Sequence, residues 1–315
     1  MSRATGSFAD ALAAGPVLLD GGLSNVLLDL GADLSGGMWT GRVLREEPGT
    51  IRAAHAAYAA AGARVLTTSS YQVGSGVPVG AGPDRAELEA LWERSVALAA
   101  EVAASAGRAT WVAASVGPYG AVLGDGSEYR GRYGLSRAEL ADWHRPRLRA
   151  LAAAGADVLA VETVPDLVEA EALTGLLSEV GVPAWLTFTL SEDGRHTAAG
   201  QPLADAFALA GASAGVVATG VNCCAPEQVA TALEIAAGVT DKPLVAYPND
   251  GSRWEAATST WHAPEGAPGS PAELSWPLDT WRALGARLIG GCCRVGPAGI
   301  ASLAGPLGTP SASAR

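Results

Sequence analysis

Short apolar runs alternate along the chain with longer stretches in which Ala and Leu recur among Glu and Arg. The apolar runs are nearly continuous, which is typical of strands that are buried on both faces of a parallel sheet. Each run is followed by a stretch long enough to form a helix. The pattern therefore predicts eight strand–helix units, with strands at residues 17–22, 63–70, 110–117, 158–163, 184–190, 216–223, 243–248 and 287–293.

The longer stretches carry signals for the start and the end of a helix. The helix predicted at 226–237 opens with Pro226 and Glu227, two residue types that are favoured in a first turn. Glycine after a helix can adopt the left-handed conformation that ends it. Further helices are expected at 84–106 and 136–154, and glycines of this kind stand at Gly62, Gly155 and Gly285.

The number of units decides the fold class. Eight strand–helix units in roughly 250 to 300 residues fit one (β/α)8 barrel, the TIM barrel, whereas a doubly wound sheet usually stops at five or six strands. We therefore predict an α/β protein that forms a single (β/α)8 barrel domain over residues 1–315.

Composition and charge exclude two classes of partner. The chain has 315 residues, of which 49% are hydrophobic and 17% charged, and a formal net charge of −11. It lacks the cluster of Lys and Arg that binds nucleic acid, and no apolar stretch reaches the roughly 18 to 20 residues of a membrane span. Asp10 interrupts the apolar N-terminal stretch, unlike a secretory signal. We expect a cytoplasmic protein with small-molecule partners; the sequence leaves monomer and homo-oligomer equally open.

Polar residues gather where the predicted strands end. In (β/α)8 barrels the chemistry lies at the C-terminal ends of the strands, so these residues are candidate site groups. They are found at 20–22, 69–72, 115–118, 162–163, 222–224, 247–249 and 291–294.

All four cysteines of the chain fall at two of these ends, after the sixth and eighth predicted strands. Those strands lie two apart around a barrel, so three thiolates can converge there and leave one position open, as in a catalytic zinc site. Gly290 and Gly291 are expected to give the backbone the freedom to turn before the adjacent pair Cys292 and Cys293. Buried thiols with no ligand and a vicinal disulfide are the competing interpretations. A reducing cytosol disfavours the disulfide, which puts the metal site ahead.

Several motifs together resemble the homocysteine S-methyltransferase family. The zinc signature of that family is matched by GVNC at 220–223 and by GGCCR at 290–294. Other matches, in the same order and with the same spacing, are LLDGGL at 18–23, TTSSYQ at 67–72, ET at 162–163, YPN at 247–249 and TWH at 260–262. The resemblance extends from about residue 17 to residue 303.

The resemblance implies roles for individual residues. It places Zn²⁺ on Cys223, Cys292 and Cys293, and the ammonium group of an amino acid substrate on Asp20 and Glu162. Ordinary solvation at a strand end is the alternative for the two carboxylates.

The extra cysteine stands beside the predicted ligand Cys223. Strand alternation would direct the side chains of Cys223 and Cys224 to opposite sides, and we expect Cys223 to be the ligand.

Other polar and aromatic residues are candidates for substrate binding. Tyr71 offers a lone pair to the open metal position or a π face to a sulfonium donor, and a packed wall tyrosine is the alternative. Asn222 and Asn249 are expected to orient the site by hydrogen bonding. A donor pocket is also expected to draw on the aromatic residues of the loop after the seventh strand, which are Trp254, Trp261 and His262.

The reaction implied is methyl transfer from a sulfonium to the sulfur of homocysteine, giving methionine. A zinc-bound thiol is ionised at neutral pH, so no general base is required. Short single-barrel members point to S-methylmethionine as donor, with S-adenosylmethionine as the alternative. Two further hypotheses are the same chemistry on selenocysteine or another thiol or selenol acceptor, and a non-catalytic zinc or thiol redox sensor.

Overall fold

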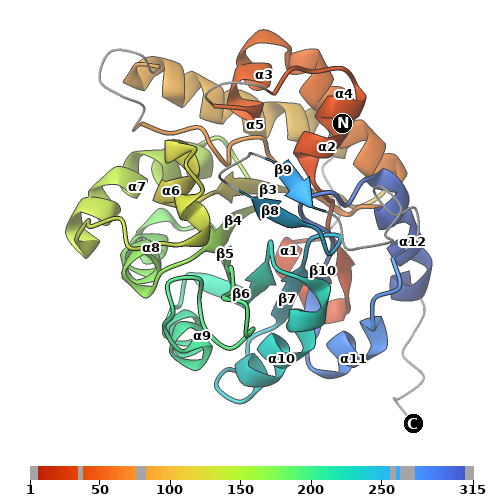
Figure 1. Cartoon of the computed structure of the whole chain (residues 1–315). Helices are drawn as coiled ribbons and strands as arrows, with labels where there is room; N and C mark the ends of the chain where they lie inside the picture. The colour runs from red at the N-terminus through yellow and green to blue at the C-terminus, as the bar shows by residue number, and fades with distance from the viewer. Residues whose placement is uncertain (1–5, 35–37, 76–82, 256–259, 263–273, 309–315) are drawn as a thin grey trace.

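Eight parallel strands form a barrel in the computed structural model, which describes residues 6–34, 38–75, 83–255, 260–262 and 274–308 (Figure 1). The strand order is β1-β10-β7-β6-β5-β4-β3-β2. The ring closes through a parallel bridge between Leu19 and Val65, where the amide of Arg64 also donates to the carbonyl of Leu18 at 2.8 Å. The predicted (β/α)8 barrel is confirmed.

The barrel strands are β1 (Val17–Leu18), β2 (Val65–Thr67), β3 (Trp111–Val116), β4 (Val158–Val164), β5 (Ala184–Phe188), β6 (Val216–Asn222), β7 (Leu244–Tyr247) and β10 (Ala286–Ile289). The helices are α1 (Phe8–Ala14), α2 (Leu23–Asp29), α3 (Thr40–Glu46), α4 (Pro48–Ala60), α5 (Arg85–Ser105), α6 (Tyr119–Leu123), α7 (Arg137–Ala153), α8 (Leu167–Val180), α9 (Leu203–Ala212), α10 (Pro226–Ala237), α11 (Leu278–Ala283) and α12 (Pro297–Gly308). A 3₁₀ turn, η1 (Ser127–Tyr129), follows α6.

Each predicted strand overlaps an observed one, and the three helices predicted with bounds match α5, α7 and α10. Seven of the eight predicted strands run one to four residues too far, because the residues at their C-terminal ends leave the ladder and enter the loops of the site, whereas the fourth was predicted to end one residue too early. The glycines at 62, 155 and 285 have φ values of +107°, +85° and +104°, so they end helices in the left-handed conformation as expected.

Two layers of apolar side chains explain why the strands are apolar throughout. One lies between the strands and the surrounding helices. The other fills the inside of the barrel and includes Trp111, Trp185 and Leu288. β4 and β5 are buried at every position, since each strand faces both layers.

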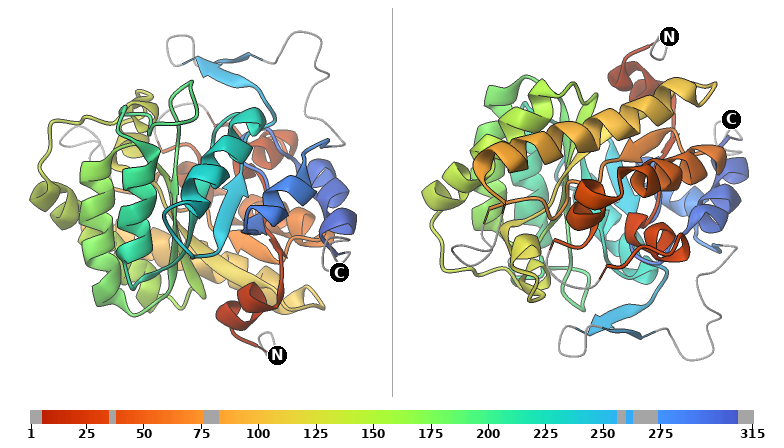
Figure 2. Two further views of the ribbon diagram at one scale, coloured as in Figure 1. Left: turned by 90° about the horizontal axis from the view of Figure 1, so that it is seen from below. Right: turned by 90° about the horizontal axis from the view of Figure 1, so that it is seen from above.

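Among the elements that were not predicted, helix α1 and the strand pair β8 and β9 lie at opposite ends of the barrel (Figure 2). Helix α1 is capped by Ser7, and its Phe8 and Leu12 join the core inside the barrel at the N-terminal end of the strands. At the other end, β8 (Arg253–Glu255) and β9 (Thr260–His262) form an antiparallel pair after β7. Among the described helices, none combines the length and the apolar character that a membrane span needs.

Candidate functional site

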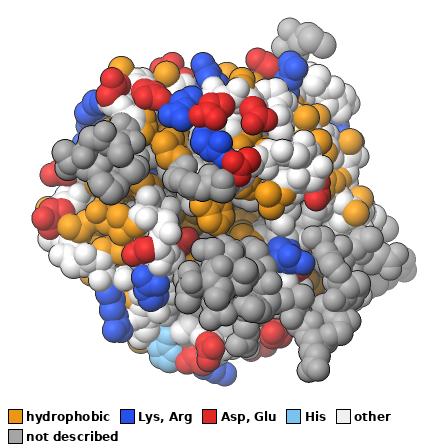
Figure 3. All heavy atoms as spheres, turned by 45° about the horizontal axis from the view of Figure 1, so that its top comes forward, with side chains coloured by type: hydrophobic (Ala, Val, Ile, Leu, Met, Phe, Trp, Pro, Cys, Tyr) orange, Lys and Arg blue, Asp and Glu red, His pale blue; other side chains and the backbone are white. Residues whose placement is uncertain are grey.

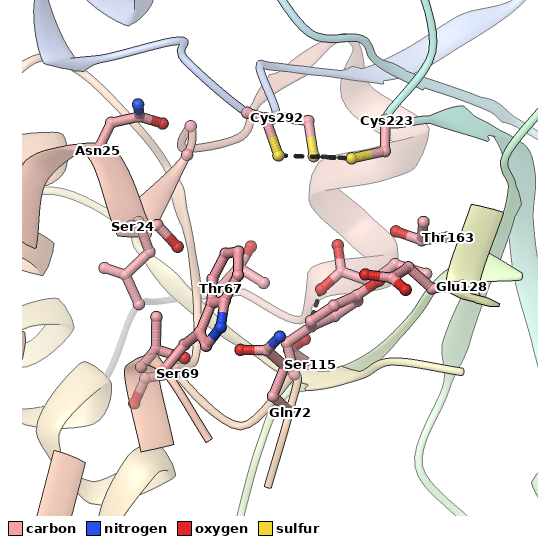
Figure 4. A pocket seen from close by; sticks show the side chains of 18 of the residues that line it. Ser24, Asn25, Thr67, Ser69, Gln72, Ser115, Glu128, Thr163, Cys223 and Cys292 are labelled. Carbon is pink, nitrogen blue, oxygen red and sulfur yellow. Dashed lines mark hydrogen bonds between the residues drawn. The ribbon is translucent and has the colours of Figure 1, made fainter. Parts of the chain in front are cut away.

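A cavity of about 380 Å³ opens at the C-terminal ends of the barrel strands. Figure 4 shows Cys223 and Cys292 above it and Ser115 and Gln72 below it. On the face of the molecule drawn in Figure 3, described Lys and Arg side chains stand among Asp and Glu side chains rather than in a patch of their own. The predicted site residues that line the cavity are Asp20, Tyr71, Glu162, Cys223, Cys292 and Cys293.

Three of the four thiols meet at the rim of this cavity. Cys223 directly follows β6, and the adjacent pair Cys292 and Cys293 follows β10, two strands away in the ring. The Sγ atom of Cys223 lies 3.1 Å from that of Cys292 and 3.6 Å from that of Cys293. The three sulfurs lie within 4.8 Å of one another and form a group able to hold a metal ion. Hydrogen bonds from the other two thiols hold the pKa of the Cys223 thiol well below its usual range.

The local backbone explains how adjacent cysteines share one site. Cys223 and Arg294 have φ values of +51° and +64°, so the chain turns at the residue that bears one thiol and again just after the pair. Gly290 and Gly291 do not have positive φ, so the expected gain in conformational freedom is not their role. They are required for space, because a Cβ on Gly291 would lie 2.2 Å from the Cγ1 of Val295.

Cys224 points away from this group. Its side chain is buried in the layer between strands and helices, where burial raises the pKa of its thiol. Its carbonyl accepts from the amide of Asn249 at 2.9 Å. The opposite orientations of Cys223 and Cys224 match the expectation from strand alternation.

Asp20 and Glu162 place two buried carboxyl groups in the wall of the cavity. Asp20 follows β1, and its oxygens accept from the amide of Thr67 at 2.6 Å and from the hydroxyl of Thr67 at 2.8 Å. Glu162, in β4, accepts from the hydroxyl of Ser115 and from that of Tyr247 at 3.1 Å. Burial raises the pKa of each carboxyl to about 7, because the ionised form loses its hydration. A cation in the cavity would restore the ionised form of both.

Tyr71 forms part of the cavity wall, with its ring against Gly117. A Cβ at Gly117 would lie 2.7 Å from the Cδ2 of Tyr71, so only a glycine there leaves room for the ring. Burial raises the pKa of the Tyr71 hydroxyl well above its usual value. The phenol is therefore neutral.

Asn222 and Asn249 lie outside the cavity wall. The amide oxygen of Asn222 accepts from the amide of Thr163 at 2.7 Å and from the hydroxyl of Thr187 at 2.8 Å, and its nitrogen donates to the Thr163 hydroxyl at 2.8 Å. Thr163 has a φ of +61°, so Asn222 stabilises a backbone conformation that is unusual for threonine. Asn249 is buried, and the hydrogen bond from its amide to the carbonyl of Cys224 holds it beside the loop that follows β6. The structure thus gives Asn222 a supporting position rather than one in the wall.

The loop aromatics Trp254, Trp261 and His262 belong to β8 and β9, and their side chains lie outside the part of the chain that the structure describes. Sequence reasoning missed several residues of the wall, among them Glu128 and Tyr129, which lie in η1. The hydroxyl of Tyr129 is 3.5 Å from the Sγ of Cys223. These residues stand 12 and 13 positions beyond the end of β3, so they are not among the residues that directly follow a strand.

Comparisons with known proteins agree with this geometry. The family model for homocysteine S-methyltransferase matches residues 17–307. The homocysteine S-methyltransferase of Escherichia coli (strain K12) is 45% identical over 294 residues, which cover 91% of this chain and 94% of the relative. That of Bacillus subtilis (strain 168) is 40% identical over 302 residues, covering 91% and 93%.

A solved structure is similar over almost the whole chain. The metallated form of the homocysteine methyltransferase MmuM from Escherichia coli has a TM-score of 0.81 and 42% identity, and the match covers 93% of this chain and 96% of that one. The fold, the three converging thiols and these similarities lead to one conclusion: the chain belongs to the homocysteine S-methyltransferase family.

Proposed function

We propose that the protein is a zinc-dependent enzyme that transfers a methyl group from a sulfonium donor to the thiol of L-homocysteine, giving L-methionine. The observation that carries the proposal is that three thiols and two buried carboxyls face the same cavity. The thiols suit a metal that activates sulfur, and the carboxyls suit an ammonium group.

The donor set fits zinc. Three cysteine sulfurs supply three of four tetrahedral positions, and bonds of about 2.3 Å place the sulfurs roughly 3.8 Å apart. The separations of 3.1 and 3.6 Å need to open by roughly 0.7 and 0.2 Å to reach this spacing. Among the described residues, the group of candidate ligands contains no fourth member, so one position remains for a substrate. When bound, zinc supplies the positive charge that lowers the pKa of a thiol in contact with it.

The carboxylates of Asp20 and Glu162 would bind the ammonium of homocysteine and orient its side chain toward the cysteines. Their own partners, Thr67, Ser115 and Tyr247, hold the carboxylates in place. We also propose that the whole chain is one domain, supported by strands that run in a single ring from Val17 to Ile289. Four free cysteines support a reducing, cytoplasmic location.

The test is methionine formation by purified protein, loaded with one equivalent of zinc or stripped by a chelator. Homocysteine is supplied with S-methylmethionine, S-adenosylmethionine or a neutral methyl thioether. The proposal predicts turnover only when the donor is a sulfonium and the protein is loaded with zinc. Zinc binding without turnover of any donor would favour a sensor, and preferred methylation of selenocysteine in direct competition would change the acceptor.

A further inference from the structure

The proposed reaction leaves two acidic side chains of the cavity, Asp125 and Glu128, without a role, and only Glu128 has a buried carboxylate oxygen that lacks a partner among the described residues. Glu128 lies in the turn η1, and its Oε2 atom is buried with no hydrogen-bond partner in the part of the chain that the structure describes. Figure 4 shows it beside Thr163 and below Cys223, with its carboxylate directed into the cavity. A buried carboxylate oxygen without a partner is costly, so a ligand that satisfies it would gain by doing so.

The turn that carries Glu128 is held firmly in position. The amide of Ser127 donates to the Oδ1 of Asp125 at 2.9 Å, and the amide of Gly131 donates to the carbonyl of Ser127 at 2.8 Å. At Gly120, in α6, a Cβ would lie 2.5 Å from the amide nitrogen of Glu128, so the two backbones are in direct contact. The position of Glu128 is therefore a fixed property of the fold.

The cavity favours positive charge. Among the described residues that line it are four carboxyl side chains and three thiols, and none of them is Lys, Arg or His. The oxygens of Asp20 and Glu162 are engaged by neighbouring hydroxyl and amide groups. Of the four carboxyls, Glu128 is the one with a buried oxygen that no described residue contacts by a hydrogen bond, and burial raises its pKa to about 7.

With S-methylmethionine as donor, three cationic groups enter this cavity in the proposed reaction: the ammonium of homocysteine, and the ammonium and the sulfonium of the donor. A sulfonium carries no proton to donate, so it is recognised by carboxylate charge and by aromatic faces. Glu128 adjoins Tyr129, whose hydroxyl is 3.5 Å from the Sγ of Cys223, and Tyr71 lies in the same wall. A charge held at Glu128 is thus close to the sulfur-binding end of the cavity.

We propose that Glu128 is the residue that selects cationic sulfonium donors, by pairing its carboxylate with the positive sulfur. This inference rests on the proposed function. In the transfer, the homocysteine sulfur forms the new bond to the methyl carbon while the bond from that carbon to the sulfonium breaks. The electron pair of the broken bond stays on the donor sulfur, which leaves as a neutral thioether and no longer pairs with Glu128.

The change of charge fixes the kinetic signature. The positive charge on the donor sulfur is full in the bound donor and is partly lost in the transition state. Glu128 therefore stabilises the bound donor at least as strongly as the transition state, and its loss raises KM for the donor while kcat changes little.

The experiment compares Glu128→Gln with the wild type, both zinc-loaded. A matched control is Glu234→Gln, which removes the same charge from an exposed position on α10. We expect KM for S-methylmethionine, and its Kd by calorimetry without homocysteine, to rise about 10- to 100-fold in Glu128→Gln. KM for homocysteine and kcat should stay within about threefold, and Glu128→Asp should recover part of the donor affinity.

A second donor separates sulfonium from ammonium recognition. The Kd of dimethylsulfoniopropionate, which lacks an amino group, should rise in Glu128→Gln by a factor similar to that for S-methylmethionine. An unchanged donor Kd, a rise limited to S-methylmethionine or a selective rise in KM for homocysteine would each overturn the inference while leaving the proposed function intact. Absence of turnover with any sulfonium in the wild type would instead contradict the proposed function.

Discussion

At the scale of single residues, Asp20 and Glu162 combine burial with ionisable groups. Each carboxyl has a pKa raised to about 7 because burial removes the hydration of its charged form. With the cavity empty such groups are only about half ionised near pH 7, and a cation that enters the cavity shifts them toward the charged form. The two acids therefore link substrate binding to protonation.

Removing one of these charges should lower kcat/KM for homocysteine selectively. In Glu162→Gln, the ammonium loses a partner in a partly desolvated cavity, at a cost of about 2 to 4 kcal/mol, or roughly 30- to 1000-fold in kcat/KM. For 4-mercaptobutanoate, which is homocysteine without its amino group, kcat/KM should be low in the wild type and should fall little further in Glu162→Gln. Steady-state kinetics with both thiols check this, and equal losses would assign Glu162 to the metal site or to the fold.

The same carboxyls predict a pH dependence of acceptor choice. Below pH 6 both are mostly protonated and cannot pair with an ammonium; as the pH rises through about 7 they ionise, while the ammonium stays charged. The ratio of kcat/KM for homocysteine to that for 4-mercaptobutanoate should rise on the order of tenfold from pH 6 to pH 8. The ratio cancels the pH dependence of the thiol chemistry common to both. A flat ratio would contradict the ammonium-binding role.

At the scale of elements, a buried polar network joins two helices to the loops of the site. Arg147 in α7 is fully buried and donates to the carbonyls of Gly117 and Tyr71. His144 bonds to Arg147 at 2.9 Å and to Glu169 in α8 at 2.9 Å. The network fixes the backbone behind Tyr71, so the wall of the cavity depends on side chains that do not touch it.

Breaking this network should cost stability. Arg147→Met leaves Glu169 and two loop carbonyls without their buried cationic neighbour, and we expect a loss of about 3 to 5 kcal/mol in the free energy of unfolding. Arg149→Met, on the exposed side of the same helix, should change it by less than about 0.5 kcal/mol. Urea denaturation measures both, and similar values for the two variants would mean that the network contributes nothing specific.

The barrel strands could be predicted because burial on both faces selects nearly continuous apolar runs, as in β4, which is buried at every position. The converging thiols could be predicted because ring order follows from chain order. The pair β8 and β9 was missed because three-residue strands in a polar loop carry no such pattern. Glu128 was missed because its place in the cavity comes from the packing of η1 on α6. Asn222 was expected to orient the site by hydrogen bonding, but its partner Thr163 could not be named because the sequence does not show which residues of neighbouring strands face each other.

At the scale of the whole molecule, the barrel and the metal centre are separate in energetic terms. The apolar layers inside and outside the barrel contain most of the buried side chains, whereas the three converging thiols lie at its C-terminal rim. Folding that depended on the metal would be expected of a small domain, not of a barrel with two extensive cores. Loss of metal should therefore abolish activity without unfolding the chain.

The most direct test of the account is the zinc content of four variants in each of which one cysteine is replaced by alanine. Circular dichroism checks that each variant is folded. The account predicts one zinc per chain in the wild type and in Cys224→Ala, and almost none in Cys223→Ala, Cys292→Ala or Cys293→Ala, all with the spectrum of the folded barrel. Zinc lost from Cys224→Ala but retained in Cys223→Ala, or unfolding of the variants that lose zinc, would contradict a catalytic centre built from these three thiols.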